Sequence, residues 1–315
     1  MSELDDLIES AQRLEATDRF REAIDVWRRV VAIDGRPDII TRLGRCLFLE
    51  GDYPEDESLW RETIVRSPGH ADAYFFLGYL YKKTARLEEA IPVLQTALRL
   101  KEWGRGYTTL GAVQRRLGQN AEARANFKRA IGLDSQDAEA WNLLGTLTED
   151  PREAADAFSR AIAADPTDVN AYRGLGEVYW KQHDLTEAER WFRKAIDVND
   201  DDAWSHNFLG QMLMERGSLV EAEAELRRAV NLMSDAVLFH TTLGEVLERL
   251  ERIDEAESAY KAALAVDVSN YLANLRYGRL LRYRGHPAKA LVYARRALAA
   301  APADRRALEL IQSLE

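Results

Sequence analysis

The sequence predicts an all-helical protein built as an array of repeated helical pairs. Glycine recurs along the chain at nearly constant intervals of 31 to 34 residues, at Gly44, Gly78, Gly111, Gly145, Gly176, Gly210, Gly244 and Gly278. Two alanine series keep the same spacing, one from Ala90 to Ala290 and one from Ala97 to Ala297. Within each period, apolar residues recur at helical steps of three and four, and the pattern breaks once. Two short helices per repeat therefore follow, and each repeat buries its apolar face against its neighbours.

Nine repeats account for most of the chain. They cover residues 1–304 and begin near Leu4, Pro37, Ala71, Gly104, Ala138, Val169, Ala203, Val237 and Tyr271. Residues 305–315 are then expected to form one amphipathic helix that caps the open end, with Leu308 and Ile311 facing inward.

Glycine inside a helix needs a physical reason, because it costs about 1 kcal/mol relative to alanine. We expect close approach of the two helices of each repeat at the glycine. Large residues are expected to fill the remaining core: Tyr74, Tyr107, Trp141 and Tyr172 on the first helices, and Trp27, Trp60, Leu94, Phe127, Phe158, Phe192 and Tyr260 on the second.

Two repeats depart from the pattern. In the second, Asp56 replaces a signature alanine, so its side chain is expected either to face solvent or to be hydrogen-bonded. This indicates a looser second repeat or a partner contact there. The fifth repeat lacks three residues between Gly145 and Ala154. Its first helix must end early or its turn must tighten, which could change the superhelix angle or open a notch in one wall.

The composition restricts the possible partners. The chain has 315 residues and a net charge of −10, which speaks against a nucleic-acid backbone or an anionic membrane as the main partner. No apolar run approaches the roughly 18 residues needed for a membrane span. Cys46 is the single cysteine, and the acidic start from Met1 to Asp6 lacks the pattern of a signal peptide. We therefore expect a cytoplasmic protein.

No residues assemble a recognisable catalytic or metal-binding motif. The five histidines are scattered, and His206 and His240 occupy a position that holds Trp141 or Tyr172 in other repeats. We expect these two histidines to pack rather than to bind metal, because no third ligand is evident. The sequence thus predicts a protein that is not an enzyme and has no cofactor.

The repeat resembles the tetratricopeptide repeat, a 34-residue helix-turn-helix with the signature W-x2-L-G-x2-Y, then A-x3-F-x2-A, then P. The first half is matched by the segments that begin at Trp141 and Tyr172, and the second half by Ala188-x3-Phe192-x2-Ala195. The resemblance covers essentially the whole chain. It implies an α-solenoid superhelix of nine units followed by the capping helix.

In this family the second, fifth, ninth, twelfth and thirteenth positions of each motif line a concave wall. In repeats two to four, these positions place six cations against Asp38 and Asp72, a local charge of about +4 that favours an acidic ligand. The cations are Arg45, Lys82, Lys83, Arg105, Arg115 and Arg116, and Phe48, Phe75 and Tyr79 share the wall. Farther along, the same positions hold Asn142, Arg173, Trp180, Lys181, Trp204, Asn207, Gln211 and Met214.

Two binding modes known in this family are not expected for this wall. Family members that grip a terminal carboxylate use asparagines that repeats one to three lack, and the asparagine ladder of the long glycosyltransferases is replaced here by Phe76, Thr109, Leu143 and Gly174.

The leading hypothesis is a non-enzymatic scaffold or adaptor that binds an acidic or mixed-charge peptide segment of another protein in its concave groove. The alternatives are a self-assembling oligomeric scaffold and a regulatory subunit of a separate enzyme. An RNA-reading repeat is disfavoured by the acidic balance of the chain.

Overall fold

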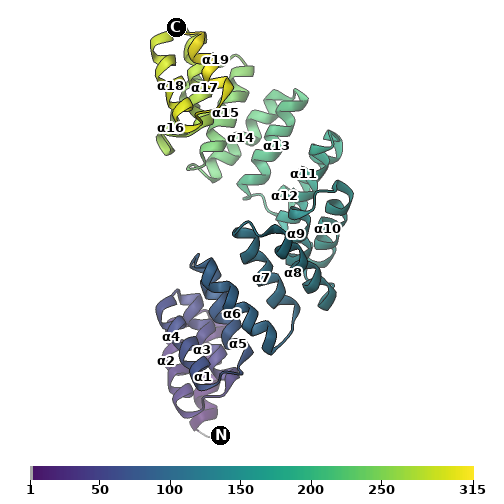
Figure 1. Cartoon of the computed structure of the whole chain (residues 1–315), viewed down its shortest axis with the longest axis vertical. Coiled ribbons are helices and arrows are strands. Elements are labelled where there is room, and N and C mark those ends of the chain that lie inside the picture. The colour runs from purple at the N-terminus through teal and green to yellow at the C-terminus, as the bar shows by residue number, and fades with distance from the viewer. Residues whose placement is uncertain (1–2) are drawn as a thin grey trace. The chain divides into compact units, whose positions relative to one another are not determined.

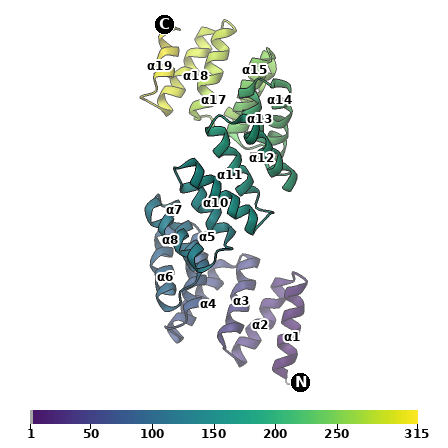
Figure 2. The ribbon, with the colours of Figure 1, turned by 90° about the vertical axis from the view of Figure 1, so that its right-hand side faces the viewer.

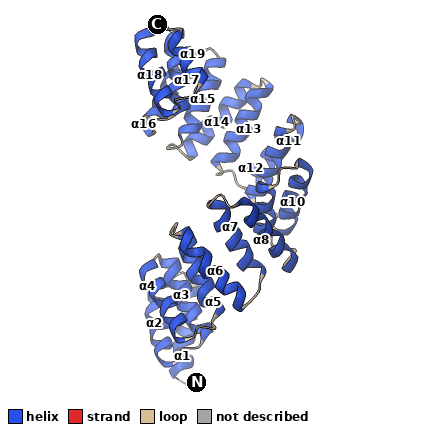
Figure 3. Ribbon diagram, in the orientation of Figure 1, coloured by secondary structure: helices blue, strands red, loops and turns tan. Residues whose placement is uncertain are grey.

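The computed structural model describes residues 3–315, and within this range every regular element is an α-helix (Figure 3). The predicted all-helical fold is confirmed. Met1 and Ser2, the first residues of the expected array and of the acidic N-terminal stretch, lie outside the described residues.

The chain divides into two compact units, Met1–Thr148 (unit 1) and Glu149–Glu315 (unit 2). The helices of unit 1 are α1 (Glu3–Ala16), α2 (Phe20–Ile33), α3 (Pro37–Glu50), α4 (Tyr53–Arg66), α5 (Ala71–Lys83), α6 (Leu87–Leu100), α7 (Gly104–Arg116), α8 (Asn120–Leu133) and α9 (Ala138–Leu147). The helices of unit 2 are α10 (Pro151–Ala164), α11 (Val169–Lys181), α12 (Leu185–Val198), α13 (Ala203–Arg216), α14 (Leu219–Leu232), α15 (Val237–Arg249), α16 (Ile253–Val266), α17 (Tyr271–Tyr283), α18 (Pro287–Ala300) and α19 (Arg305–Gln312).

The odd-numbered helices from α3 to α17 begin at the residues where the sequence starts a repeat. Within each unit, an odd helix and the even helix that follows it form a hairpin, as α5 with α6 and α13 with α14 do (Figures 1 and 2). Each even helix also packs against the next odd helix, so that the hairpins of a unit form one continuous stack.

The repeated glycines mark the closest approach within a hairpin. A Cβ atom at Gly44 would lie 2.1 Å from Cζ2 of Trp60, and one at Gly244 would lie 2.5 Å from Cε1 of Tyr260. Contacts under 3.0 Å also arise at Gly78, Gly111, Gly176 and Gly210. Glycine therefore makes room for the large residue of the second helix, as expected from the sequence.

The predicted core residues separate into two groups. Those on the second helices are buried: Trp27, Trp60, Leu94, Phe127, Phe158, Phe192 and Tyr260. Those on the first helices, which are Tyr74, Tyr107, Trp141 and Tyr172, are only half-buried. The second helices thus supply most of the fully buried aromatic side chains, while the first helices contribute mainly aliphatic ones such as Leu47 and Leu175.

The fifth repeat is short because its first helix ends early. Helix α9 has 10 residues, whereas α7 and α11 have 13. The Asp150 side chain then accepts hydrogen bonds from the backbone N–H groups of Arg152 and Glu153 and begins α10. Of the two alternatives, the early end of the helix is confirmed, and the boundary between the two compact units falls at this shortened repeat.

Asp56 is not exposed, and one of its carboxylate oxygens is not hydrogen-bonded. The residue is 1% exposed, and Oδ1 lacks a hydrogen-bond partner among the described residues. The sequence expectation is wrong for this oxygen, because the position of the signature alanine faces the interior whichever residue occupies it. Burial raises the pKa of Asp56 to about 7, although a hydrogen bond with the Trp60 side chain favours the charged form. Helix α3 also contacts α4 less extensively than α5 contacts α6, in keeping with a looser second repeat.

The C-terminal helix packs against α17 and α18, and Ile311 faces inward there as expected. Ala307 and Leu310 are buried, whereas Leu308 is 41% exposed. The inward prediction for Leu308 is therefore wrong, because the inward face follows residues 307, 310, 311 and 314 around the helix.

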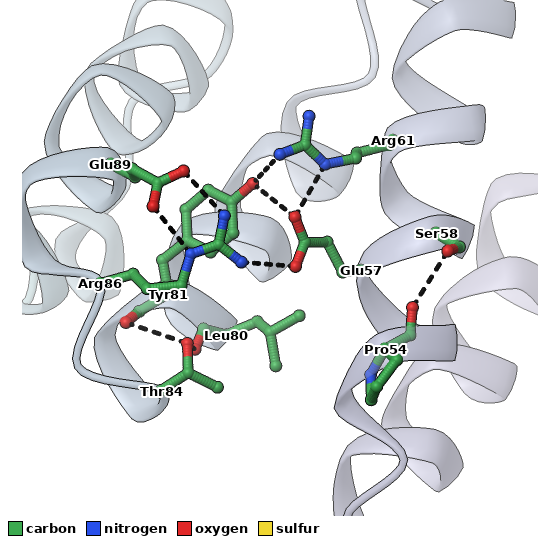
Figure 4. A network of polar contacts seen from close by, with 9 residues as sticks. All are labelled: Pro54, Glu57, Ser58, Arg61, Leu80, Tyr81, Thr84, Arg86 and Glu89. Carbon is green, nitrogen blue, oxygen red and sulfur yellow. Dashed lines mark hydrogen bonds and ion pairs between the residues drawn. The ribbon is translucent and has the colours of Figure 1, made fainter.

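A carboxylate clasp joins the second and third repeats (Figure 4). Glu57 on α4 accepts hydrogen bonds from Nε of Arg61 at 2.8 Å, from the Tyr81 hydroxyl at 3.1 Å and from Nη1 of Arg86 at 2.6 Å. Burial opposes the charge of Glu57, but these hydrogen bonds outweigh burial and hold its pKa below the usual value. Arg86 also binds Glu89.

Unit 2 repeats this clasp three times. Glu189, Glu223 and Glu257 each contact a cation on their own helix and an arginine of the next repeat. At Glu223, Arg227 lies at 2.8 Å and Arg252 at 2.5 Å. The same position holds Ile91, Arg124 and Ala155 in the third, fourth and fifth repeats. The clasp therefore cannot form from the second helices of those repeats.

Candidate peptide-binding surface

The expected wall in unit 1 is carried by α3, α5 and α7, and an aromatic group lies within it. The rings of Phe48 and Tyr79 are 5.3 Å apart, and those of Phe75 and Tyr79 are 6.2 Å apart. Lys82 lies over the Tyr79 ring at 5.5 Å from its centre, which is within cation–π range. Cations and aromatic rings thus come together here, as the sequence predicts.

Phe75 does not present its side chain at this wall. It is 4% exposed because it packs against Trp103, with ring centres 5.4 Å apart, and because the Arg105 guanidinium lies 5.7 Å from the centre of its ring. The expectation that Phe75 contacts a ligand directly is therefore corrected. Its ring instead contacts the Tyr79 ring and the Arg105 guanidinium.

Two of the six predicted cations are already paired within unit 1. Arg45 lies 2.8 Å from Glu15, a buried carboxylate that also accepts a hydrogen bond from Nε1 of Trp27 at 2.6 Å. Lys82 lies 3.7 Å from Glu139 on α9. The expected local charge of about +4 omits these two carboxylates, and including them reduces it to about +2.

The other four cations differ in their contacts. Arg116 donates to the backbone carbonyl of Lys82 at 2.9 Å, and Arg105 is exposed over Phe75. Lys83 and Arg115 are exposed, and neither has an ion-pair partner within 4.0 Å among residues 3–315. We name these four residues the basic wall. Lys83 and Arg115 are its cations with the fewest internal contacts.

Trp180 forms the centre of the corresponding surface in unit 2. It is half-buried on α11, and its ring meets those of Phe192 and Phe208 edge-on at 6.2 and 6.4 Å. Its indole N–H donates to Glu215 on α13. The Trp180 ring is thus fixed on both sides while one part of it remains in contact with solvent.

Clefts lie beside this tryptophan. One, of about 350 Å³, is lined by Glu177, Trp180, Lys181, His183, Phe208 and Glu215. A second, of about 430 Å³, is lined by Trp180, Gln211, Met214, Glu215 and Arg249. The predicted residues Trp180, Lys181, Gln211 and Met214 therefore come together along these clefts.

Trp204 is the large apolar side chain of this predicted set with the most open position. It is 38% exposed and rests against Phe239, with ring centres 5.0 Å apart. Arg173, in contrast, is bound within the unit, because Nη1 donates to Asp202 at 2.8 Å and Nη2 donates to Asn170 at 2.6 Å. A ligand would have to compete with these contacts to bind Arg173.

Asn207 is inaccessible to a peptide. Its exposed fraction is 0%, and neither Oδ1 nor Nδ2 has a hydrogen-bond partner among the described residues. The expectation that Asn207 binds a peptide backbone is therefore corrected: its position on α13 faces the packed interior. Asn142, the other predicted asparagine, is half-buried on α9 in unit 1.

Sequence reasoning did not select several residues that shape these surfaces. Glu177 and Glu215 occupy the ninth and thirteenth positions of their motifs, so the spacing that selected Trp180 could have found them. Glu15 and Glu139 reduce the local positive charge because they form ion pairs with Arg45 and Lys82 on other helices. No local sequence pattern indicates such pairs.

The two histidines expected to pack have polar partners. His206 is buried, and its ring nitrogens contact Glu225 at 2.7 Å and the Asp200 carbonyl at 3.0 Å. Burial opposes the charge of His206, but these contacts outweigh burial and raise its pKa. His240 contacts the Ser234 carbonyl at 2.8 Å. Both rings thus tie a helix to the preceding loop.

Residues 3–315 include no group of three or more His, Cys, Asp or Glu side chains placed to hold a metal ion. The same residues contain no helix with both the length and the apolar character required to cross a membrane.

A family model for the tetratricopeptide repeat matches residues 108–147, 148–203 and 241–310, which together are more than half of the chain. A second model with the same description matches residues 71–102. These matches include most of α7, with Arg115 and Arg116 of the basic wall, and all of α11, which carries Trp180.

Solved structures share the fold. The crystal structure of the APC/C hetero-tetramer Cut9–Hcn1 matches 93% of this chain with a TM-score of 0.66 and 15% identity. This chain spans 58% of the length of that one. A tetratricopeptide repeat protein from Parabacteroides merdae matches 78% of this chain and 98% of its own, with a TM-score of 0.60 and 15% identity. PilF of Pseudomonas aeruginosa matches 67% of this chain and 97% of its own, with a TM-score of 0.59 and 16% identity.

Proposed function

The chain belongs to the tetratricopeptide repeat family, and we propose that it is a non-enzymatic scaffold that binds a peptide segment of a partner protein on the inner faces of its odd-numbered helices. Proteins of this family bind other proteins. The proposal goes further: it assigns the binding to the basic wall and to the surface around Trp180, and it assigns an acidic or mixed-charge segment as the ligand.

The observation that carries the proposal is the state of the basic wall. Lys83 and Arg115 are exposed cations that make no ion pair with the residues described here, although carboxylates outnumber cations in the chain as a whole. A folded protein of net charge −10 readily supplies internal partners, as it does for Arg45 and Lys82. Exposed cations that are left unpaired in this way favour an external carboxylate.

An array of synthetic twelve-residue peptides of acidic, neutral and basic composition tests this assignment. We expect the acidic peptides to bind most tightly and their affinity to fall as salt is raised from 50 to 500 mM, because salt screens exposed charges. An affinity that does not depend on salt would contradict the electrostatic part of the proposal.

Charge reversal locates the binding. Arg115→Glu with Arg116→Glu is expected to weaken acidic peptides by about tenfold or more, equivalent to about 1.4 kcal/mol. Lys128→Glu with Arg152→Glu is the matched control, since these residues are exposed on α8 and α10 and make the same change in net charge. Equal loss in both double variants would contradict a site at the basic wall.

Self-association is the outcome that would replace this proposal. Sedimentation at several protein concentrations distinguishes the two, because a peptide-binding scaffold stays monomeric while a self-assembling one grows with concentration. A regulatory subunit remains within the proposal, with the enzyme as the partner that supplies the peptide segment. We also propose a cytoplasmic location, which the single buried thiol of Cys46 supports.

A further inference from the structure

The cleft beside Trp180 has aromatic walls that are held in place. The Trp180 ring is buttressed edge-on by Phe192 and Phe208, and its indole N–H is bound to Glu215. The cleft is about 350 Å³, the surface that it exposes is mostly apolar, and its residues come from α11, from the turn that follows α11 and from α13. A long side chain with an apolar stem fits a cleft of this character.

A carboxylate without a cation partner stands at the same cleft. Glu177 lies one helical turn before Trp180 on α11, so both side chains project from one face of the helix. The described residues offer Glu177 no cation within 4.0 Å. Burial raises the pKa of Glu177, although Lys181 and Arg173 favour its charged form. The carboxylate is therefore partly desolvated and incompletely compensated.

The cations nearby do not fill this role. Arg249 donates to the Met214 carbonyl at 3.1 Å and lies 3.2 Å from Glu245, so its charge is engaged elsewhere. Lys181 is exposed at the rim and makes no ion pair in the described part of the chain. Nδ1 of His183 also lies 3.8 Å from Glu215.

We propose that this cleft is a subsite for a cationic side chain, arginine or lysine, supplied by the partner segment. The inference rests on the proposed function and adds a second recognition element to it. The apolar stem of the ligand lies against Trp180 and Phe208, and its charged end reaches Glu177 and Glu215. A cation beside an aromatic face and a carboxylate gains from both groups.

Other occupants fit the cleft less well. An anion would be repelled by Glu177 and Glu215. A purely apolar side chain would exclude more water from Glu177 without supplying a compensating charge, which is costly.

The probe for this subsite is Nα-acetyl-arginine amide, and its neutral analogue is Nα-acetyl-citrulline amide, which has nearly the same shape. Binding is followed by ¹⁹F NMR of protein labelled with 5-fluorotryptophan, and the Trp180 resonance is assigned by its loss in Trp180→Phe. We expect the arginine probe to shift the Trp180 resonance and to bind at least about tenfold more tightly than the citrulline probe. Equal affinity of the two probes, or no shift at Trp180, would overturn the proposal.

Three variants sharpen the assignment. Glu177→Gln should weaken the arginine probe by about tenfold, whereas Glu122→Gln, an exposed carboxylate on α8, should leave it unchanged. Lys181→Ala should tighten binding, because it removes the competing charge at the rim. Circular dichroism checks that Glu177→Gln is folded. If the folded variant binds the arginine probe as tightly as the wild type does, the proposed subsite is contradicted.

The experiments distinguish a failure of the proposed subsite from a failure of the proposed function. If acidic peptides bind through Arg115 and Arg116 while the arginine probe does not shift Trp180, the scaffold stands and the subsite is wrong. If the arginine probe binds as described and acidic peptides do not, the basic wall is wrong and the subsite stands.

Discussion

The inner faces of the two units carry different side chains on the same repeated framework. In unit 1 the surface is basic, with exposed Lys83 and Arg115. In unit 2 it is aromatic and partly acidic, centred on Trp180 and Glu177. The glycine and alanine positions that hold each hairpin together are common to both units. The fixed positions thus define the fold, and the inner positions are free to diverge in chemistry.

The units also differ in how their repeats are joined. Unit 2 has carboxylate clasps at Glu189, Glu223 and Glu257, whereas unit 1 has the clasp at Glu57 and the buried Asp56 one residue before it. Half-buried networks of this kind contribute more than isolated surface ion pairs. We therefore expect the second repeat to be the least stable part of unit 1 and the repeats of unit 2 to be held more firmly.

The largest expected effect is at Asp56. Its pKa of about 7 lies above the ordinary value of 3.8, so between these values the folded state binds more protons than the unfolded state and stability falls as pH rises. Asp56→Ala should therefore raise the free energy of unfolding, and the gain should grow by about 3 kcal/mol from pH 5 to pH 8. Urea unfolding followed by circular dichroism at both pH values measures it.

Asp197→Ala is the control for this variant, since Asp197 is exposed on α12. It should show no gain that depends on pH. If Asp56→Ala raises the free energy of unfolding equally at pH 5 and pH 8, the buried carboxyl of Asp56 is not the cause of the low stability expected for the second repeat.

The next effect compares two glycines, one in each unit. A Cβ at Gly44 would lie 2.1 Å from the Trp60 ring, whereas one at Gly278 would lie 3.2 Å from the flexible end of Leu310. Gly44→Ala is expected to destabilise the protein by about 2 kcal/mol, because overpacking outweighs the gain in helix propensity. Gly278→Ala should be neutral or stabilising by up to about 1 kcal/mol. Thermal unfolding of both variants decides, and equal destabilisation would show that the close approach does not explain the glycines.

A smaller effect tests the clasps. Glu223→Gln removes the charge that Arg227 and Arg252 share, and it should lower the stability of unit 2 by about 1 kcal/mol. Amide hydrogen exchange in α14 and α15 should then become faster. Glu251→Gln, at an exposed turn of the next repeat, provides the comparison. Unchanged exchange in Glu223→Gln would mean that the clasps do not join the repeats.

The sequence predicts the fold well because each repeat gives independent evidence for the same pattern. The start of α5 at Ala71, the packing of Gly78 and the shortening of the fifth repeat all follow from local spacing, although the spacing alone leaves open whether α9 ends early or its turn tightens. Candidate surface residues such as Trp180 and Arg115 also follow from spacing, through the inner positions of the motif.

The remaining features depend on contacts between helices far apart in the sequence. The pairing of Lys82 with Glu139 joins α5 to α9, and the Glu15 group joins α1, α2 and α3. The burial of Asn207 similarly depends on the helices that pack against α13. A periodic pattern identifies which face a residue occupies, but it does not show which side chain from another helix covers it.

The central claim, that the two units recognise opposite charges, is tested most directly by a cross-titration. An acidic twelve-residue peptide and Nα-acetyl-arginine amide are each titrated into the wild-type protein, the Arg115→Glu and Arg116→Glu double variant, and Glu177→Gln. We predict that the double variant loses only the acidic peptide and that Glu177→Gln loses only the arginine probe. Loss of both ligands in one variant, or of neither in both, would contradict the account.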